Sequence, residues 1–412
     1  MKTSTVKGTN DYLPKEVLLR DYLQNTILET YINNGFEHII TPAIEDAENL
    51  DKSEGGENLN LIFKILKRGD KLAKAIEEKN YDSLSDMGLR YDLTLPLSRY
   101  YANNRANLIL PLKTIQIDRV YRAERPQKGR LREFIQCDID IIGSTNPSCE
   151  IELIYTTAKA LLAININEFR IKVNDRRLLS AVLCGIGFSK EDIESVCIVF
   201  DKLDKIGIEG VISELNEKGY DNDVTAKFEQ FIGDGNITLE TVRSFISEEN
   251  ECYVSHIERI INESKKLAKE KYDVVFDISL VRGQGYYTGT IFEVESLKFK
   301  GAIAGGGRYD NLIGKFTGES VPAVGFSIGF ERIYSILSEQ NYKPDDYRKK
   351  VAVFYNEEEY TDACIKADEL RNEYDVTMYA RPKKLGKFLG KIEMQGYYGF
   401  LVYGEEGEIK LL

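Results

Sequence analysis

Arginines and carboxylates in the segment from Ile115 to Gly143 are the residues of this chain best suited to chemistry. Apolar and polar residues alternate on both sides of a turn rich in positive charge, which predicts a strand, a loop and a second strand. The period of two places Arg122 and Glu124 on one face of the first strand. On the second strand it places Phe134, Gln136, Asp138 and Asp140 on one face and Ile135, Cys137, Ile139 and Ile141 on the buried face.

The loop between these strands carries the positive charge. Arg125, Lys128, Arg130 and Arg132 stand where they could grip a phosphate chain or the end of a nucleic acid. A surface hairpin with a charged tip is the alternative, and the loop by itself does not decide between the two.

Length and composition limit the chemistry further. A chain of 412 residues with 42% apolar and 30% charged residues predicts a soluble protein of two or three domains. We expect a cytoplasmic protein that does not enter a membrane, because no apolar run reaches bilayer length and the N-terminus lacks the apolar core of a signal peptide. The net charge of −12 disfavours sequence-blind binding to nucleic acid but allows a local basic surface.

Cysteine and histidine, which are scarce in this chain, limit the possible chemistry as well. Six scattered cysteines without a CxxC pair argue against a disulfide framework and against a zinc site. Only His38 and His256 could act as imidazoles. Any chemistry must therefore use arginines and carboxylates, and a metal, if one takes part, would be held by carboxylates and substrate phosphates rather than by a protein cage.

Periodicity divides the chain into domains. Residues 1–174 predict the first part of a core, beginning with a helix over 15–34 and a strand FEHIITPAIE, in which Pro42 indicates an edge position. Residues 175–270 show helical periods and predict an inserted helical domain, and residues 271–340 return to the core. After a polar linker, residues 349–412 alternate strand and helix, which predicts a small α/β domain.

Four further segments of the core carry polar residues or glycines. In GLRYDLTLPLSRYYANN, Asp92 and Thr94 share one strand face and Pro96 opens a helix, although Asp92 could instead cap that helix. In DVVFDISLVRGQGYYTG, two strands flank a Gly-Gln-Gly turn that carries Arg282, Tyr286 and Tyr287. The glycines of AIAGGGRYD are not a P-loop, because a Gly-Lys pair followed by Ser or Thr is missing. They could instead form a tight bend between strands. VPAVGFSIGFERIYSIL predicts a strand and then a helix with Arg332 in its first turn.

A basic segment lies in the small terminal domain. Its positive residues are Arg381, Lys383, Lys384, Lys387 and Lys391. A solvated helix face and a docking surface for an RNA loop are both compatible with this pattern.

Taken together, these segments resemble a class II aminoacyl-tRNA synthetase, and within that class the histidyl-tRNA synthetase family. YRAE with Arg122 and Glu124, followed by Arg130, matches the second class motif; GFSIGFER matches the third; and Pro42 stands where the first motif has its proline. The histidine-specific signatures appear in order as KGTND, RYDLT, REFIQCDID, LVRGQGYYTGTIFE and AGGGRYD. The resemblance implies an α+β fold: a class II catalytic core with a mixed, mostly antiparallel sheet flanked by helices, a helical insertion and a C-terminal α/β anticodon-binding-like domain.

The resemblance also implies roles for single residues. Arg122 and Arg282 would be catalytic. Arg122 would hold the α-phosphate of ATP, with Glu124, Arg130 and Arg332 around the rest of the nucleotide. For histidine, Asp92, Thr94 and Gln136 would hold the ammonium and carboxylate ends, while Asp140 and Tyr287, beside Tyr286, would meet the imidazole. Arg125 and Gln127 would meet the acceptor end of the tRNA.

The implied reaction fits a chain with few histidines. An amino acid carboxylate is already ionised when it attacks the α-phosphate, so no general base is needed, and arginines with Mg²⁺ neutralise the charge that builds on phosphorus. The resemblance therefore implies ATP with Mg²⁺, histidine, the acceptor end and anticodon region of a tRNA, and a homodimer formed near Pro42. The chain departs from the family at Gln284 and Gly285, where Leu-Asp is usual, and at Leu131, where an aromatic residue is usual.

Two other functions share this fold. One is a synthetase-like regulatory subunit of the ATP phosphoribosyltransferase of histidine biosynthesis, and the other is a non-catalytic module that senses RNA or an amino acid. The regulatory relative characteristically loses arginine and glutamate positions of the ATP motifs. Arg122, Glu124, Arg130 and Arg332 are all present here, which favours the enzyme.

Overall fold

The chain forms two compact units in a computed structural model, which describes residues 1–52, 61–126, 130–233, 235, 237–281, 286–299, 301–344, 348–405 and 408–412. One unit comprises Met1–Asn10 and Leu23–Ile336, and the other comprises Asp11–Tyr22 and Leu337–Leu412. Helix α1 (Pro14–Asn33) contributes residues to both units. Among the described helices, none combines the length and the apolar character needed to cross a membrane.

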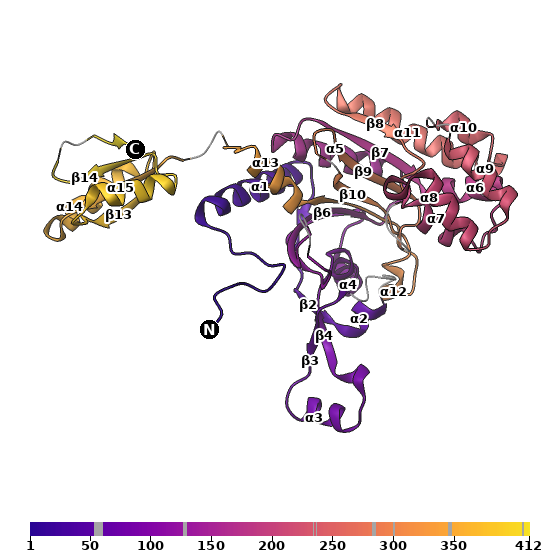
Figure 1. Cartoon of the computed structure of the whole chain (residues 1–412), viewed down its shortest axis with the longest axis horizontal. Helices are drawn as coiled ribbons and strands as arrows, with labels where there is room; N and C mark the ends of the chain where they lie inside the picture. The colour runs from indigo at the N-terminus through magenta and orange to yellow at the C-terminus, as the bar shows by residue number, and fades with distance from the viewer. Residues whose placement is uncertain are drawn as a thin grey trace. The chain divides into compact units, whose positions relative to one another are not determined.

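An eight-stranded sheet forms the centre of the first unit (Figure 1). Its order is β1 (Glu37–His38), β5 (Leu112–Tyr121), β6 (Glu133–Ile142), β11 (Ala323–Gly329), β10 (Ala302–Arg308), β9 (Thr290–Ser296), β7 (Phe169–Asp175) and β8 (Asp273–Phe276). Only the outermost pairs, β1 with β5 and β7 with β8, are parallel. The mixed, mostly antiparallel sheet expected from the sequence is therefore present.

One face of this sheet is covered by helices. Helix α5 (Ser148–Ala163) packs against β6 and β11, and α11 (Glu251–Ala268) packs against β7 and β8. The predicted buried face of β6 is confirmed, because Ile135, Cys137, Ile139 and Ile141 are at most 4% exposed.

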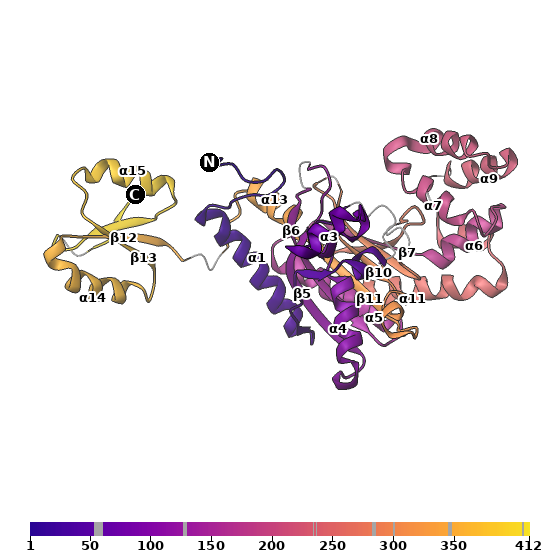
Figure 2. The ribbon, with the colours of Figure 1, turned by 90° about the horizontal axis from the view of Figure 1, so that it is seen from below.

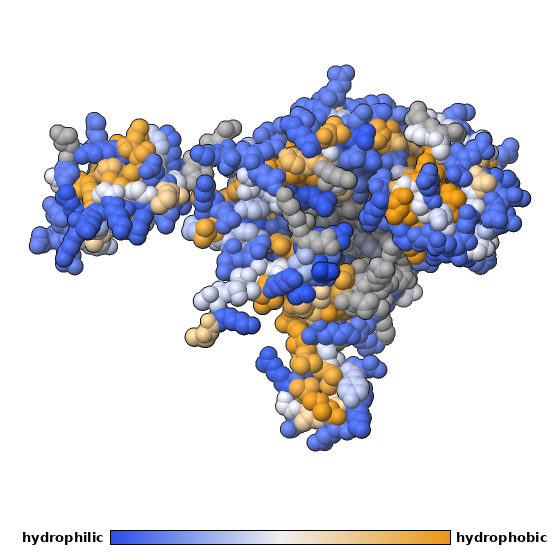
Figure 3. All heavy atoms as spheres, viewed as in Figure 1, coloured by the Kyte–Doolittle hydropathy of each residue, from blue (hydrophilic) through white to orange (hydrophobic). Residues whose placement is uncertain are grey.

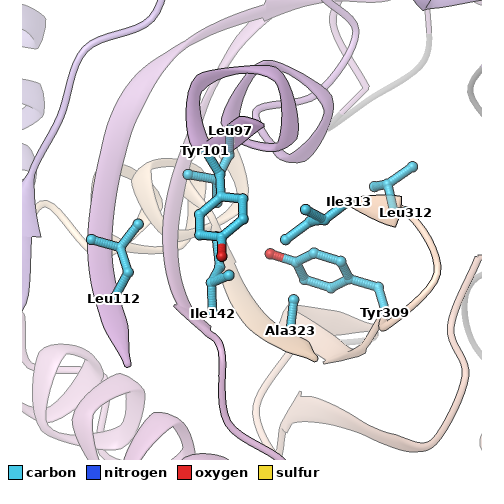
Figure 4. Close-up of a cluster of buried hydrophobic side chains, with 8 residues drawn as sticks. All are labelled: Leu97, Tyr101, Leu112, Ile142, Tyr309, Leu312, Ile313 and Ala323. Atoms are coloured by element: carbon cyan, nitrogen blue, oxygen red, sulfur yellow. The ribbon is translucent and has the colours of Figure 1, made fainter. Parts of the chain in front are cut away.

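A second apolar cluster joins helix α4 (Thr94–Asn104) to the sheet. In Figure 4, Leu97 and Tyr101 of α4 face Leu112, Ile142 and Ala323 of the sheet strands, and the ring of Tyr309 completes the group. This cluster fixes the start of α4 close to the end of β10.

The glycines of AIAGGGRYD lie within strand β10, so the alternative of a tight bend is wrong. A Cβ atom on Gly306 would approach the backbone oxygen of Gly325 to 2.0 Å. Glycine is needed here because β10 and β11 approach more closely than a side chain allows.

Helices occupy the described part of the chain between β7 and β8. They are α6 (Arg176–Ile186), α7 (Ile193–Phe200), α8 (Leu203–Glu217), α9 (Asn222–Gly233), α10 (Leu239–Arg243) and α11. Figures 1 and 2 both show α6 to α9 grouped together and away from β5 and β6. Phe188, Phe200 and Phe228 form edge-to-face ring contacts at the centre of this group.

A three-stranded sheet projects from the first unit, in the order β2 (Ile44–Asp46), β4 (Ser85–Leu89) and β3 (Lys64–Leu66). Helix α2 (Ala47–Lys52) follows β2, and α3 (Asp70–Glu77) follows β3. The expected single strand FEHIITPAIE is instead two strands in two sheets, β1 and β2, with Pro42 between them. Proline cannot donate to a ladder, and the chain changes sheets where this donor is missing.

One other sequence-based expectation needs correction. Asp92 and Thr94 do not share a strand face, because β4 ends at Leu89 and α4 begins at Thr94, which puts Pro96 inside the first turn. Asp92 Oδ1 accepts a hydrogen bond of 3.2 Å from the Leu95 backbone N, so the capping alternative is observed. Strands β8 and β9 flank the Gly-Gln-Gly segment in the sequence, as expected, and in the sheet β7 lies between them.

The second unit alternates strands and helices. Its elements are β12 (Lys350–Tyr355), α14 (Tyr360–Leu370), β13 (Asp375–Ala380), α15 (Leu385–Met394), β14 (Gly399–Val402) and β15 (Lys410–Leu411), in the sheet order β13-β12-β14-β15. β12 is parallel to both β13 and β14, as helix crossovers require.

Candidate active site

A cavity of about 840 Å³ lies on the face of the large sheet that also bears α4. It collects most of the residues singled out from the sequence: Asp92, Thr94, Arg122, Glu124, Arg130, Gln136, Asp140, Tyr286, Tyr287 and Arg332. They come from the loops after β4 and β5, from the start of α4, from β6, from the segment before β9 and from helix α13 (Phe330–Glu339).

The remaining predicted residues lie elsewhere. Arg125 is exposed and does not line the cavity. Gln127, Arg282 and the unusual Gly285 fall outside the described residues. Leu131, the other departure from the family pattern, lines the cavity, so its smaller side chain bears directly on the site.

Strand β6 supplies one wall of the cavity. Phe134, Gln136, Asp138 and Asp140 all line it, as the alternation of the strand predicts. On the neighbouring strand β11, Ser327 is the register partner of Asp138 and Gly325 is the partner of Asp140.

Glycines make the adjacent floor of the cavity. Gly305 and Gly307 of β10 pair with Ser327 and Gly325 of β11, and all four residues line the cavity. A Cβ atom on Gly325 would lie 2.0 Å from Asp140 Oδ1. A bound molecule can therefore rest directly on the backbone of β10 and β11, and the Asp140 carboxylate occupies the space that a side chain at position 325 would need.

Three carboxyl groups cluster at one end of the cavity. Burial raises the pKa of Asp92 to about 6 and that of Asp140 to about 7; the nearby Glu45 adds to the shift of Asp92, and Asp92 adds to the shift of Asp140. Burial, followed by the nearby Asp140 carboxylate, raises the pKa of Asp138 well above its usual value. This end is poised to receive a cationic or hydrogen-bond-donating ligand, which would favour the ionised carboxylates.

Asp140 has one strong internal partner. The Tyr309 hydroxyl donates a 2.6 Å hydrogen bond to Asp140 Oδ1, and Tyr309 is 2% exposed within the cluster of Figure 4. Sequence reasoning assigned no role to Tyr309, although it lies in the signature AGGGRYD. Nearby, the Tyr286 hydroxyl donates to the Tyr287 hydroxyl over 3.2 Å, and their ring centroids are 4.4 Å apart.

Arg122 stands between this carboxylate end and the basic end, which is formed by Arg130 and Arg332, because its charge acts on both Asp92 and Asp138. Strand β5 ends at Tyr121, so Arg122 and Glu124 follow the strand rather than lying on its face as expected. Both still line the cavity. Arg122 Nε donates to the Tyr91 backbone oxygen over 3.0 Å, and the guanidinium carbon lies 5.0 Å from the Phe134 ring centroid. These contacts orient its guanidinium group on the cavity wall.

The other arginines are also held by specific contacts. An Arg130 terminal nitrogen lies 3.5 Å from Glu124 Oε2, and more than half of the Arg130 side chain is exposed. Arg332 lies in the first turn of α13, as predicted, and donates to the Ala302 backbone oxygen. Glu331 beside it accepts a 3.4 Å hydrogen bond from the Ile135 backbone N; this buried, cavity-lining carboxylate was not singled out from the sequence.

The signature KGTND lies against the charged hairpin. The Gly8 backbone oxygen accepts a 2.7 Å hydrogen bond from the Arg132 backbone N. Gly8 has a φ of +90°, and a Cβ atom there would come within 2.7 Å of Pro126. Glycine is required because the backbone turns in a left-handed conformation directly on the loop.

The cavity thus separates charge along its length. Carboxylates gather where β6 meets α4, and arginines gather at the hairpin and the start of α13. Such an arrangement suits a ligand pair that carries positive and hydrogen-donating groups at one end and phosphates at the other. Within the described residues, no group of three His, Cys, Asp or Glu side chains has an arrangement that could hold a metal ion.

Comparison with known proteins gives a consistent result. A family model described as histidyl-tRNA synthetase matches residues 8–333. The histidine–tRNA ligase of Leifsonia xyli is 42% identical over 80% of this chain and 79% of its own length. The corresponding protein of Cytophaga hutchinsonii is 35% identical over 98% of this chain and 93% of its own length.

Solved structures agree in fold. The histidyl-tRNA synthetase of Nostoc sp. PCC 7120 matches 97% of this chain and 91% of its own with a TM-score of 0.79 at 28% identity. A Bacillus halodurans protein, an ATP phosphoribosyltransferase regulatory subunit/histidyl-tRNA synthetase, matches 98% of both chains with a TM-score of 0.78, but at 19% identity this likeness shows the fold alone. The family model spans the sheet and the cavity described above, and with it the chain belongs to the histidyl-tRNA synthetase family, with a class II core and a C-terminal α/β domain.

Proposed function

We propose that this protein activates histidine with ATP, forming histidyl-adenylate, and transfers the histidyl group to the 3′ end of its tRNA. The observation that carries this proposal is that one cavity is lined both by three carboxyl groups, Asp92, Asp138 and Asp140, and by three arginines, Arg122, Arg130 and Arg332. Residues 1–174 and 271–340 would form the catalytic core, 175–270 an insertion and 349–412 an anticodon-binding-like domain. We expect the protein to act in the cytoplasm.

The basic end would bind ATP. Arg122, already oriented by Tyr91 and Phe134, would meet the α-phosphate, and Arg130 and Arg332 would meet the rest of the triphosphate. Glu124 would lie beside the adenine, and the bare backbone of Gly305 and Gly307 leaves room for a flat ring. Mg²⁺ would arrive with the triphosphate as part of the substrate and reduce repulsion between the reacting anions.

The acidic end would bind histidine. Asp92, Thr94 and Gln136 would hold its ammonium and carboxylate groups, and Asp140 and Tyr287, beside Tyr286, would hydrogen-bond the two imidazole nitrogens. Tyr309 supports this role for Asp140, because its hydrogen bond fixes one carboxylate oxygen and leaves the other to a ligand. A side chain lacking a ring nitrogen would leave buried polar groups unpaired, which rejects it.

The direct test of this selectivity is Asp140→Ala. It should weaken histidine binding by roughly 2 to 4 kcal/mol, the scale of removing a hydrogen bond to a charged group in a buried site. ATP affinity should barely change, because the basic end is left intact. Calorimetry that finds unchanged histidine affinity would make Asp140 structural.

Arg282 is the second proposed catalytic residue, and this role follows from the family pattern alone. A guanidinium that meets both the reacting carboxylate and the α-phosphate contributes most as charge builds in the transition state. Arg282→Ala should cut single-turnover adenylate formation by about two orders of magnitude, with smaller effects on substrate affinities. Lysine should rescue the rate only in part, because a point charge lacks the planar fork of arginine.

Histidine-dependent exchange of labelled pyrophosphate into ATP tests the enzyme against its regulatory relative. Folded wild-type protein with Mg²⁺ should catalyse exchange with histidine and not with other amino acids. Absence of exchange would favour a regulatory subunit or a sensing module. The three cavity arginines favour the enzyme, because a module that only senses histidine does not need to neutralise a triphosphate.

Two surfaces would serve the tRNA. Arg125 and Gln127 of the hairpin loop would meet the acceptor end, and exposed lysines at the start of α15, Lys383, Lys384 and Lys387, would meet the anticodon region. Lys384→Glu with Lys387→Glu should raise the KM for tRNA and leave pyrophosphate exchange unchanged. Lys387→Glu alone compared with Lys366→Glu on α14 is the control, because each reverses one charge on a different helix.

We also propose a homodimer formed near Pro42. Exposed apolar side chains flank this proline in the chain: Ile40 is 78% exposed and Ile44 is 51% exposed. Apolar surface is visible on the projecting three-stranded sheet in Figure 3, where Leu66 and Met87 are also exposed. Ile44→Glu should shift the protein toward monomer in sedimentation equilibrium, because an interface cannot bury an unpaired charge without cost.

A further inference from the structure

Two buried oxygen atoms in the cavity wall have no hydrogen-bond partner among the described residues. They are Gln136 Oε1 and Asp138 Oδ1. Both side chains line the cavity from the same face of β6, and Asp138 is only 4% exposed. Acceptors of this kind are costly in a folded protein unless something donates to them.

One hydroxyl group connects the two side chains. Gln136 Nε2 donates to Ser327 Oγ over 3.2 Å. Ser327 also hydrogen-bonds with the Asp138 carboxylate, its register partner across the β6–β11 ladder. A serine hydroxyl has one proton, so while it donates that proton to Asp138 it can only accept from Gln136.

The direction of the hydrogen bonds that link Gln136, Ser327 and Asp138 decides which atom of the Gln136 amide faces the cavity. An amide can turn over and exchange its oxygen for its nitrogen with little change in shape. If Ser327 donates to Asp138, the amide nitrogen must face Ser327. Gln136 Oε1 is then left as an acceptor, which suits an ammonium group and not a carboxylate.

We propose that Asp138 and Ser327 are positioning residues that lock the Gln136 amide with its oxygen toward the α-ammonium group of the amino acid substrate. This inference deepens the proposed function and rests on it. Neither residue needs to touch the substrate: Asp138 orients Ser327, and Ser327 orients Gln136. The expected ammonium site then combines the Asp92 carboxylate with Gln136 Oε1.

The test compares histidine with 3-(imidazol-4-yl)propionate, which is histidine without its amino group. Calorimetry on the full chain gives the ratio of the two affinities. Ser327→Ala removes the hydroxyl and frees the amide to turn, so histidine should bind about tenfold more weakly, the scale of one lost hydrogen bond to a charged group. The analogue should bind within about twofold of its wild-type affinity, because it has no ammonium group for Gln136 to meet.

Two further variants separate orientation from packing. Ser327→Thr keeps the hydroxyl and should restore the wild-type ratio. Ser264→Ala removes a fully buried serine hydroxyl from α11, away from the cavity, and should leave the ratio unchanged. Thermal melting of each variant shows whether the fold is intact.

The outcomes are distinguishable. If wild-type protein prefers histidine to the analogue but Ser327→Ala loses affinity for both equally, the residues only shape the pocket and the inference is wrong. The same holds if Ser327→Ala leaves the ratio unchanged. If the wild-type protein binds both molecules equally or neither, the proposed function fails, and the inference fails with it.

Discussion

Two neighbouring arginines, Arg90 and Arg122, are used in opposite ways. Two hydrogen bonds hold their chain segments side by side. The Arg90 backbone oxygen accepts from the Tyr121 backbone N, and Arg122 Nε donates to the Tyr91 backbone oxygen. Arg90 is 1% exposed, and its guanidinium donates to the backbone oxygens of Thr41 and Arg119 and pairs with Asp118 at 2.7 Å. Arg122 is half-buried and faces the cavity.

The difference teaches how to read buried charge. The Arg90 group is neutralised by the protein itself, which ties the segment around Pro42 to strand β5. The cavity instead holds three carboxyl groups with raised pKa values and three arginines that line the same space. Charge that the protein leaves to be neutralised by a ligand marks the site, whereas charge that it neutralises internally marks the scaffold.

The largest expected effect is on the rate of adenylate formation, when Arg122 is replaced. Arg122→Ala should slow single-turnover adenylate formation by about 10²- to 10³-fold, the scale of removing one preorganised electrostatic donor. Its free energy of unfolding should change by no more than about 1 kcal/mol, because the side chain is half-buried. A variant that keeps its rate but melts early would place Arg122 in the scaffold with Arg90.

Arg90→Met should show the reverse pattern. We expect the free energy of unfolding in urea to fall by about 3 kcal/mol, because backbone oxygens of two segments lose a charged donor. Adenylate formation by the folded protein should change less than tenfold. Arg119→Ala is the matched control: it breaks only the exposed pair with Glu133 and should cost about 0.5 kcal/mol or less. Equal losses in the two variants would contradict a scaffold role for Arg90.

The third prediction uses pH to sharpen the contrast. The folded pKa values of Asp92 and Asp140, about 6 and about 7, lie above the unfolded value near 3.8. Their stabilising contribution is therefore complete below about pH 4 and is lost as pH rises through 6 and then 7. Without substrate, Asp140→Asn should be more stable than wild type by about 2 kcal/mol at pH 8 and by much less at pH 5.

Chemical unfolding of both proteins across this pH range checks the linkage. Histidine at saturating concentration should abolish most of the difference at pH 8, because its donors stabilise the ionised wild-type carboxylate. A difference between the two proteins that does not change from pH 5 to pH 8 would show that Asp140 is ionised throughout and is neutralised inside the protein, like the Arg90 group.

The sequence pattern within single strands and helices correctly predicted the cavity-lining face of β6 and the position of Arg332. The alternation of β6 was correct because one face is buried under α5 and the other lines the cavity. Arg332 was placed correctly because a strand followed by a helix start has a clear signature. Asp92 and Thr94 were misplaced because a four-residue connection between strand and helix cannot be separated from an extended strand by alternation alone.

Non-local register explains what sequence reasoning missed. Tyr309 reads as a core residue, and only the pairing of β10, β11 and β6 brings its hydroxyl to Asp140. The link from Asp138 through Ser327 to Gln136 also crosses two strands far apart in the chain. The strand role of Gly305 to Gly307 was left open because glycine weakens a strand locally, and its use here depends on how closely β11 approaches.

The contact between Gly325 and Asp140 has a consequence for redesigning the amino acid pocket. The Asp140 carboxylate fills the space that a side chain at position 325 would need, so the sizes of residues 140 and 325 are coupled. A larger residue at 325 would displace Asp140 and so change the pocket beyond its own contact with the substrate. Conversely, shortening Asp140 would leave a void that Gly325 cannot fill. A mutant library intended to change the substrate should therefore vary positions 140 and 325 together. A change at only one of them leaves either a clash or a void at the other.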